Sequence, residues 1–245
     1  MRPALAALVA ALLAALVSML VYALVRGAPR DDDAQKKGVR FLLGLGDFLL
    51  HWFLWAIGPL EGAVRRRGAT PDQMNAAGVL LGLLSGWLVG TGRLELGGWA
   101  IAAAGVCDLL DGRLARARGV ASSYGKFIDS TLDRFVESFA YLGFVAYFRD
   151  RPEGAFVAAA ALAGSLLVSY AAARGETVNV SGAGGLMQRG ERLVLTALGC
   201  LLDPTLSALL ARPEGTVLLW ILAAIAAGAF LTAVYRTAWI ARRLR

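Results

Sequence analysis

The segment Cys107–Glu137 reads CDLLDGRLARARGVASSYGKFIDSTLDRFVE and carries four aspartates in two pairs. Asp108 and Asp111 are three residues apart, so both lie on one face of a helix. Asp129 and Asp133 are four residues apart and share one face of the next helix. About one turn of loop separates the two helices, and an antiparallel hairpin would therefore bring all four carboxylates together.

Four converging carboxylates repel one another unless cations neutralise their charge. Hard oxygen ligands of this kind suit Mg²⁺ or Mn²⁺, and two such ions, roughly 3.5–4 Å apart, would bind and polarise a diphosphate. A structural alternative is that an aspartate pairs with an arginine, as Asp108 could with Arg116. That alternative leaves the other aspartates unexplained. Because a buried carboxylate is costly, each of them needs a partner or a function. The segment therefore predicts a site for two divalent metal ions.

The rest of the chain is apolar enough for a membrane protein. Of its 245 residues, 58% are hydrophobic, and the mean hydropathy is +0.60. A helix that crosses a bilayer needs about 20 mostly apolar residues, and lipid offers backbone groups no water partners, so such runs are expected to be helices. These runs are Pro3–Val25, Met74–Val89, Leu96–Leu110, Phe135–Phe148, Ala155–Ala173, Leu193–Leu210 and Val217–Ile240. They predict an all-α integral membrane protein.

Three regions follow from this pattern. Residues 1–38 would be an uncleaved N-terminal transmembrane anchor and its linker, because basic residues follow the first apolar run. Residues 39–69 carry a polar stripe opposite an aromatic-rich face, which is typical of an amphipathic helix lying in the membrane interface. His51, in that stripe, is expected at headgroup level on the surface. Residues 70–245 would then form a six-span catalytic domain.

The net charge of +7 comes from basic residues that cluster at the ends of the apolar runs. This placement is typical of topology signals and of contact with anionic membrane lipids, and no soluble basic domain suggests nucleic acid. The positive-inside rule places the loops at Arg113–Arg118 and Arg174–Arg192 in the cytoplasm. We therefore expect a multi-pass protein of the cell membrane whose active site faces the cytoplasm.

Taken as a whole, the aspartate segment resembles the signature of a known family. It contains Asp108-x-x-Asp111-Gly112-x-x-Ala115-Arg116, eight residues, then Gly125-x-x-x-Asp129-x-x-x-Asp133. This resembles the complete pattern of the CDP-alcohol phosphatidyltransferases. The resemblance covers about Thr70 to the C-terminus, with six spans and a preceding interfacial helix. It implies a homodimeric enzyme that transfers a phosphatidyl group from CDP-diacylglycerol to a polar alcohol and releases CMP.

The resemblance also implies a role for each fixed residue. The metal ligands would be Asp108, Asp111, Asp129 and Asp133, and Asp133 would also act as general base on the acceptor hydroxyl. The residues that bind CDP would be Asp108, Gly112, Ala115, Arg116 and Gly125. Gly112 and Ala115 are small enough for the nucleotide to approach the helix closely. The guanidinium fork of Arg116 suits a diphosphate, and Gly125 would relieve crowding near the nucleotide.

A second group of arginines bears on the acceptor alcohol. Arg174 ends one predicted span, and Arg189 and Arg192 begin the next. Arginine recognises a dianionic phosphate well, but arginines at the ends of spans are also ordinary positive-inside residues. The Arg-x-Glu and Arg-x-Glu-Arg-Leu sequences here resemble the branch of the family that uses inositol phosphate. By that similarity these three arginines would hold the acceptor phosphate, and Lys126 and Arg134 are further candidates.

Other acceptors and another class of enzyme stay open. Glycerol 3-phosphate would make the protein a phosphatidylglycerophosphate synthase, and free inositol would be a neutral acceptor. Lys126 stands where a small residue is expected in the inositol phosphate branch. Intramembrane prenyltransferases also hold a diphosphate by metal on aspartate-rich helices, but their two motifs lie far apart in the chain. A transporter with a carboxylate relay would spread its acids over several helices.

Overall fold

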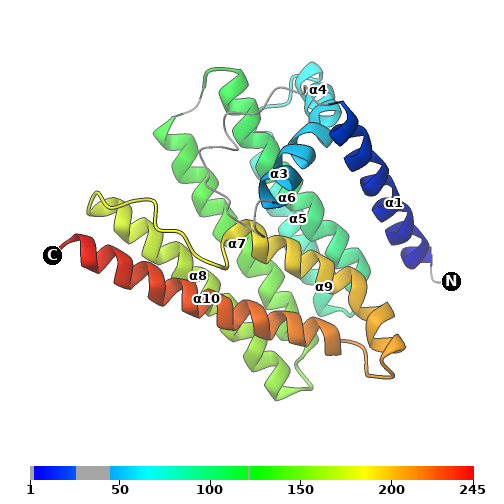
Figure 1. Ribbon diagram of the computed structural model, residues 1–245. Coiled ribbons are helices and arrows are strands. Elements are labelled where there is room, and N and C mark those ends of the chain that lie inside the picture. The colour runs from blue at the N-terminus through cyan, green and yellow to red at the C-terminus, as the bar shows by residue number, and fades with distance from the viewer. Residues whose placement is uncertain (1–2, 26–44, 121) are drawn as a thin grey trace. The chain divides into compact units, whose positions relative to one another are not determined.

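The computed structural model describes residues 3–25, 45–120 and 122–245 (Figure 1). These residues form helices and no strands. The helices are α1 (Pro3–Leu24), α3 (Leu45–Ala56), α4 (Gly58–Arg66), α5 (Pro71–Gly90), α6 (Leu94–Ala117), α7 (Ser123–Tyr147), α8 (Pro152–Thr177), α9 (Arg189–Leu209) and α10 (Thr216–Arg243). The chain divides into two compact units, Met1–Ala69 and Thr70–Arg245. The predicted boundary between residues 38 and 39 lies outside the described residues.

In the first unit, α1 is a continuous helix of 22 residues. At 1.5 Å per residue it is about 33 Å long, which matches the apolar thickness of a bilayer. It packs against α3, where Trp52 Nε1 donates a hydrogen bond of 2.8 Å to Ser18 Oγ. The ring of Tyr22 also lies 5.7 Å from that of Trp55.

The expected interfacial helix over residues 39–69 is two helices in its described part. The break falls at Ile57, and Pro59 stands in the first turn of α4. Proline has no N–H to donate and its ring clashes with the preceding turn, so a helix readily begins there but does not run through. His51, expected at the surface, is instead buried, with 9% of its surface exposed. His51 is therefore not the surface residue that the polar stripe predicted.

The second unit contains six helices of 20 to 28 residues within its described residues. Each of the six covers all or nearly all of one apolar run predicted after Thr70. Four of them, α5, α8, α9 and α10, are long and apolar enough to cross a membrane. The other two, α6 and α7, are as long but carry the aspartates. The protein is thus an all-α multi-pass membrane protein, as predicted.

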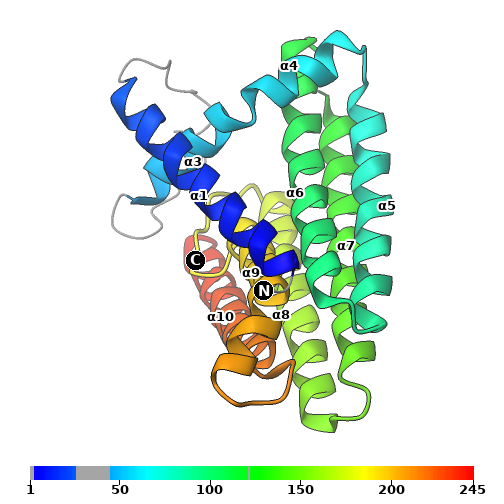
Figure 2. The same cartoon turned by 90° about the vertical axis from the view of Figure 1, so that its right-hand side faces the viewer.

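Helix α5 begins with a capping box, and two glycines further along it allow α7 to pack closely. Thr70 and Gln73 form a capping box, in which Gln73 N donates to Thr70 Oγ1 at 3.2 Å and Thr70 N donates to Gln73 Oε1 at 2.9 Å. Further along α5, a Cβ on Gly82 would lie 2.9 Å from the Cα of Val136, and one on Gly86 would overlap backbone of α7. Glycine at these two positions therefore permits the tight contact between α5 and α7. Figure 2 shows these two helices next to α6.

The other half of the unit is built from α8, α9 and α10, and α10 packs against both of the others (Figure 1). Asp203, near the end of α9, is fully buried. Its carboxylate accepts hydrogen bonds from Ser207 Oγ at 2.9 Å, Gly215 N at 2.6 Å and Leu218 N at 2.9 Å. Two of these donors are backbone N–H groups at the start of α10, which would otherwise lack partners. Asp203 therefore fastens the turn between α9 and α10.

Candidate active site

Carboxylates from two neighbouring helices converge in the second unit. Asp108 and Asp111 lie near the end of α6, and Asp129 and Asp133 lie in the first half of α7. One oxygen each from Asp108, Asp111 and Asp129 lies within 4.8 Å of the other two. Asp111 is buried, whereas Asp108 and Asp129 are partly exposed. The hairpin therefore brings the first aspartate pair and Asp129 of the second pair into one cluster.

Arg189, the first residue of α9, joins the two pairs. Its Nη1 lies 2.6 Å from Asp108 Oδ2, and its Nη2 lies 2.6 Å from Asp133 Oδ1. Asp133 also has Arg134 Nη1 3.4 Å from its second oxygen. Guanidinium groups thus offset part of the negative charge of the cluster, and one of them comes from a helix far away in the sequence.

The cluster fits a hard divalent cation. Asp111 Oδ2 is buried and accepts no hydrogen bond from the described residues. A buried acceptor without a donor costs about 1–3 kcal/mol, and a cation held by Asp108, Asp111 and Asp129 would remove that cost. Oxygen donors of this kind are those that Mg²⁺ and Mn²⁺ prefer. A second ion would need Asp133, whose carboxylate is engaged by Arg189 here.

The residues predicted to bind CDP lie along the mouth of the same hairpin. Arg116 is exposed in the last turn of α6, and a Cβ on Gly112 would lie 3.3 Å from its Nη1. Gly112 therefore leaves the guanidinium room to lie over the helix. Gly125 is in the first turn of α7, where its N–H donates to the capping Ser122 Oγ at 3.1 Å. Ala115 is half-buried on α6.

Arg192 is buried and forms an ion pair within the protein. This side chain is 1% exposed, and its Nε and Nη2 donate to the two oxygens of Glu137 at 2.7 and 3.1 Å. Its Nη1 donates to Met187 O at 3.0 Å. The fork of Arg192 is therefore occupied by Glu137 here, while the side chain also lines the larger of the two pockets described below.

Glu137 is a functional candidate that sequence reasoning missed. It follows Asp133 by four residues on α7, so it continues the same helical face by one more turn. That spacing was the available signal. Its partner Arg192 is 55 residues away in the chain, and only the fold reveals the pair.

Two further acceptor candidates lie at the surface. Lys126 Nζ forms an ion pair of 2.9 Å with Glu176 Oε2, and the side chains are 72% and 54% exposed. Exposed pairs of this kind contribute little to stability. Arg174 is exposed in the last turn of α8. The ion pair links the first turn of α7 to the end of α8, beside the hairpin.

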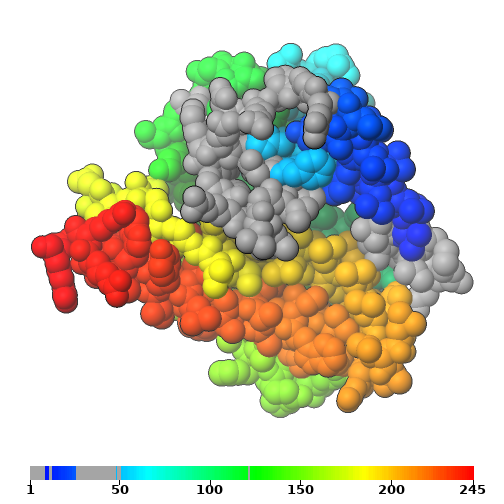
Figure 3. All heavy atoms as spheres, in the orientation of Figure 1, coloured from blue at the N-terminus to red at the C-terminus, as the bar shows by residue number. Residues whose placement is uncertain are grey.

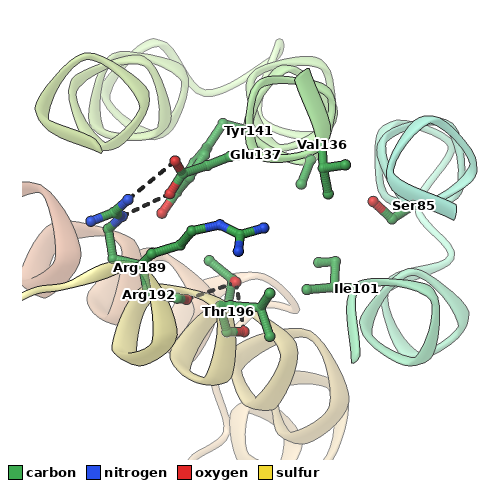
Figure 4. Close-up of a pocket in the computed structure, with 10 residues that line it drawn as sticks. Ser85, Ile101, Val136, Glu137, Tyr141, Arg189, Arg192 and Thr196 are labelled. Carbon is green, nitrogen blue, oxygen red and sulfur yellow. Dashed lines mark hydrogen bonds and ion pairs between the residues drawn. The ribbon is translucent and has the colours of Figure 1, made fainter. Parts of the chain in front are cut away.

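Two pockets meet at Arg189. The smaller has about 240 Å³ of empty space, partly open to solvent, and is lined by Asn75, Gly78, Asp108, Asp111, Asp133 and Arg189 among others. The larger, of about 410 Å³, is lined by Ser85, Ile101, Glu137, Tyr141, Arg189 and Thr196 among others (Figure 4). In Figure 4 Arg189 extends into this pocket, while the guanidinium of Arg192 turns toward Glu137. Arg189 can therefore face both the metal cluster and the larger pocket.

Comparisons with known proteins identify the family to which this chain belongs. The family model for CDP-alcohol phosphatidyltransferase matches residues 69–234. The phosphatidylinositol phosphate synthase of Mycobacteroides abscessus is 34% identical over 147 residues, which cover 58% of this chain and 67% of that protein. The chain thus spans about two thirds of the length of such curated relatives.

Two solved structures of the Mycobacterium tuberculosis phosphatidylinositol phosphate synthase resemble this one. The crystal structure with CDP-DAG bound has a TM-score of 0.64 and 27% identity, covering 74% of this chain and 92% of that chain. The structure in complex with manganese and citrate has a TM-score of 0.65 and 27% identity, covering 74% and 87%. With the family model matched over most of the chain, this protein belongs to the CDP-alcohol phosphatidyltransferase family.

Proposed function

We propose that this protein transfers a phosphatidyl group from CDP-diacylglycerol to inositol phosphate and releases CMP. The observation that carries the proposal is the cluster of Asp108, Asp111 and Asp129, with Arg189 bridging Asp108 to Asp133. It is supported by relatives named phosphatidylinositol phosphate synthase and by a structural neighbour with CDP-DAG bound.

The residues divide the chemistry between them. Mg²⁺ or Mn²⁺ ions, held by the four aspartates, would polarise the diphosphate and neutralise the charge that develops on it. Arg116, beside Gly112, binds the diphosphate and orients the nucleotide. Asp133 takes the proton from the acceptor hydroxyl as general base. The acceptor oxygen then forms a bond to the lipid-linked phosphorus while the bond from that phosphorus to the CMP oxygen breaks, and CMP leaves with the electron pair.

Arg189 is the residue best suited to select a phosphorylated acceptor. It lines both pockets and stands next to Asp133, so it can hold the acceptor phosphate close to the general base. Arg134, also beside Asp133, is a second donor. Arg192 acts indirectly through Glu137 and Met187, and Arg174 and Lys126 provide positive charge at the exposed approach.

The surroundings of the site belong to the same proposal. Residues 70–245 are the catalytic domain of a homodimer in the cell membrane, and the site faces the cytoplasm, where soluble acceptor is available. Residues 1–38 are an anchor and residues 39–69 an interfacial segment that contacts membrane lipids. The basic residues at the ends of the helices support this orientation.

The test is release of CMP by purified full-length protein in CDP-diacylglycerol micelles with Mn²⁺ or Mg²⁺. Inositol phosphate, glycerol 3-phosphate, free inositol and serine are compared as acceptors at equal concentration. We expect metal-dependent release that is fastest with inositol phosphate. Faster release with glycerol 3-phosphate would assign the protein to phosphatidylglycerophosphate synthesis instead. If folded protein releases CMP with none of the four acceptors, the acceptor assignment is refuted.

A further inference from the structure

One face of α10 lies against the connection between α8 and α9. The face consists of Gly228, Thr232 and Arg236, which follow one another at intervals of four and therefore lie in a row. The connection, residues 178–188, is yellow in Figure 3 and runs directly along the orange-to-red surface of α10. Thr232 is 2% exposed and Arg236 9% exposed, so both side chains are almost enclosed by this contact.

Each member of this row fits a particular part of the connection. Thr232 Oγ1 accepts a hydrogen bond of 3.1 Å from Met187 N. Arg236 Nε donates to Gly184 O at 3.1 Å. Gly228 provides space, since a Cβ there would lie 2.8 Å from Met187 Cε.

The charged guanidinium of Arg236 donates its hydrogen bonds to backbone carbonyl groups. Its Nη1 donates to Val168 O on α8 at 3.0 Å, in addition to the bond to Gly184 O. Among the described residues no carboxylate lies within ion-pair distance of it. A buried guanidinium is costly unless its donors are used, and hydrogen bonds from a charged donor are stronger than neutral ones. Arg236 on α10 thus holds both the middle of α8 and the connection.

The contacts continue from the connection into the active site. Met187 O accepts from Arg192 Nη1, and Arg192 in turn holds Glu137 on α7. Two residues after Met187, Arg189 begins α9 and reaches Asp108 and Asp133. The contact of Met187 with Thr232 on α10 therefore fixes where α9 begins. It thereby also fixes where the Arg189 guanidinium lies.

We infer that Thr232 and Arg236 are positioning residues, which hold the start of α9 so that Arg189 meets the acceptor phosphate. The inference rests on the proposed function, because it assigns Arg189 to the acceptor. It places the effect of these two residues on acceptor binding, since neither contacts Asp108, Asp111 or the CDP side of the hairpin in the described residues.

The experiment compares Thr232→Val with Thr237→Val in full-length protein. Both changes replace a hydroxyl by a methyl group on α10, but Thr237 is an exposed residue, and within the described part of the chain its hydroxyl donates only to Ala233 O of its own helix. We expect Thr232→Val to raise the KM for inositol phosphate roughly 5- to 30-fold, the factor that loss of one buried hydrogen bond carries. The KM for CDP-diacylglycerol should stay within about twofold. Thr232→Ser, which keeps the acceptor oxygen, should restore most of the loss.

A second readout does not depend on the acceptor. Hydrogen–deuterium exchange of residues 184–192 should be faster in Thr232→Val and unchanged in Thr237→Val, because the Met187 amide loses its partner. Arg236→Met should give the same pattern and serves as a second variant if Thr232→Val does not fold. An equal rise in the KM of both substrates, or unchanged exchange, would overturn the inference. If wild-type protein uses another phosphorylated acceptor, the proposed function fails, while the exchange pattern and the KM for that acceptor still test the positioning role.

Discussion

Two regions of the bundle bury aspartates in opposite ways. Asp203 on α9 is fully buried, and its two oxygens accept hydrogen bonds from one hydroxyl and two backbone N–H groups. Asp111 on α6 is 3% exposed, yet its Oδ2 has no donor among the described residues. One oxygen each of Asp108 and Asp129 lies within 4.8 Å of an oxygen of Asp111.

The difference lies in what surrounds the carboxylate. At Asp203 the start of α10 supplies N–H groups and the positive end of a helix dipole, so the protein itself stabilises the charge. At Asp111 the neighbours are other acids, and only a cation from solution or an arginine can offset the repulsion. A buried acid whose partners are complete stabilises the fold, whereas one whose partners are missing marks a place for a ligand.

The largest effect should come from Asp133→Asn. The amide cannot take the proton from the acceptor, and we expect kcat to fall by about 10²- to 10⁴-fold, the range for loss of a general base. Binding of CDP-diacylglycerol should be retained better than in Asp108→Asn, because Asp108 is placed next to Asp111 in the metal cluster. Single-turnover CMP release and equilibrium binding of the CDP-lipid measure the two properties separately.

The matched comparison is between the two amide variants. If Asp133→Asn and Asp108→Asn lose metal and CDP-lipid binding equally, Asp133 has no separate role as a base. If both bind the CDP-lipid like wild type and still turn over, the cluster is not the catalytic site.

The local part of the site was predictable from the sequence, and the long-range part was not. The aspartates lie three or four residues apart within one hairpin, so helical periodicity alone placed each pair on a shared face. The bridge from Arg189 to Asp108 spans 81 residues, and nothing in the local pattern specifies it. The same holds for the pair that Arg192 forms with Glu137, which is 55 residues away in the chain.

The fold shows the same division. The apolar runs predicted six helices after Thr70 because a bilayer requires long helices whatever their packing. The break at Ile57 and the burial of His51 were missed, because the polar stripe was read as one continuous helix. Pro59 was the available signal for the break, whereas the burial of His51 depends on tertiary packing that hydropathy does not report.

A smaller effect should appear when metal is added to folded protein without substrate. Mn²⁺ at about 100 times its dissociation constant should stabilise wild-type protein by about 2.7 kcal/mol. Asp111→Asn should lose most of this gain, because it removes a carboxylate from the group of three. The measurement is thermal unfolding in detergent with Mn²⁺ or with chelator, and Asp203→Asn is the control that should respond to Mn²⁺ like wild type. An equal response of Asp111→Asn would remove Asp111 from the metal site.

The smallest effect should come from Asp203→Asn, and it should fall on stability alone. Asparagine keeps one acceptor oxygen but turns a donating NH₂ group toward Gly215 N or Leu218 N, both of which are donors. We expect the free energy of unfolding in mixed micelles to fall by about 1–2 kcal/mol. CMP release per folded molecule should be unchanged at low temperature, because Asp203 belongs to the turn between α9 and α10 and not to the carboxylate cluster. A loss of turnover with unchanged stability would mean that Asp203 acts in catalysis, as the carboxylate cluster does, and not in holding the turn between α9 and α10.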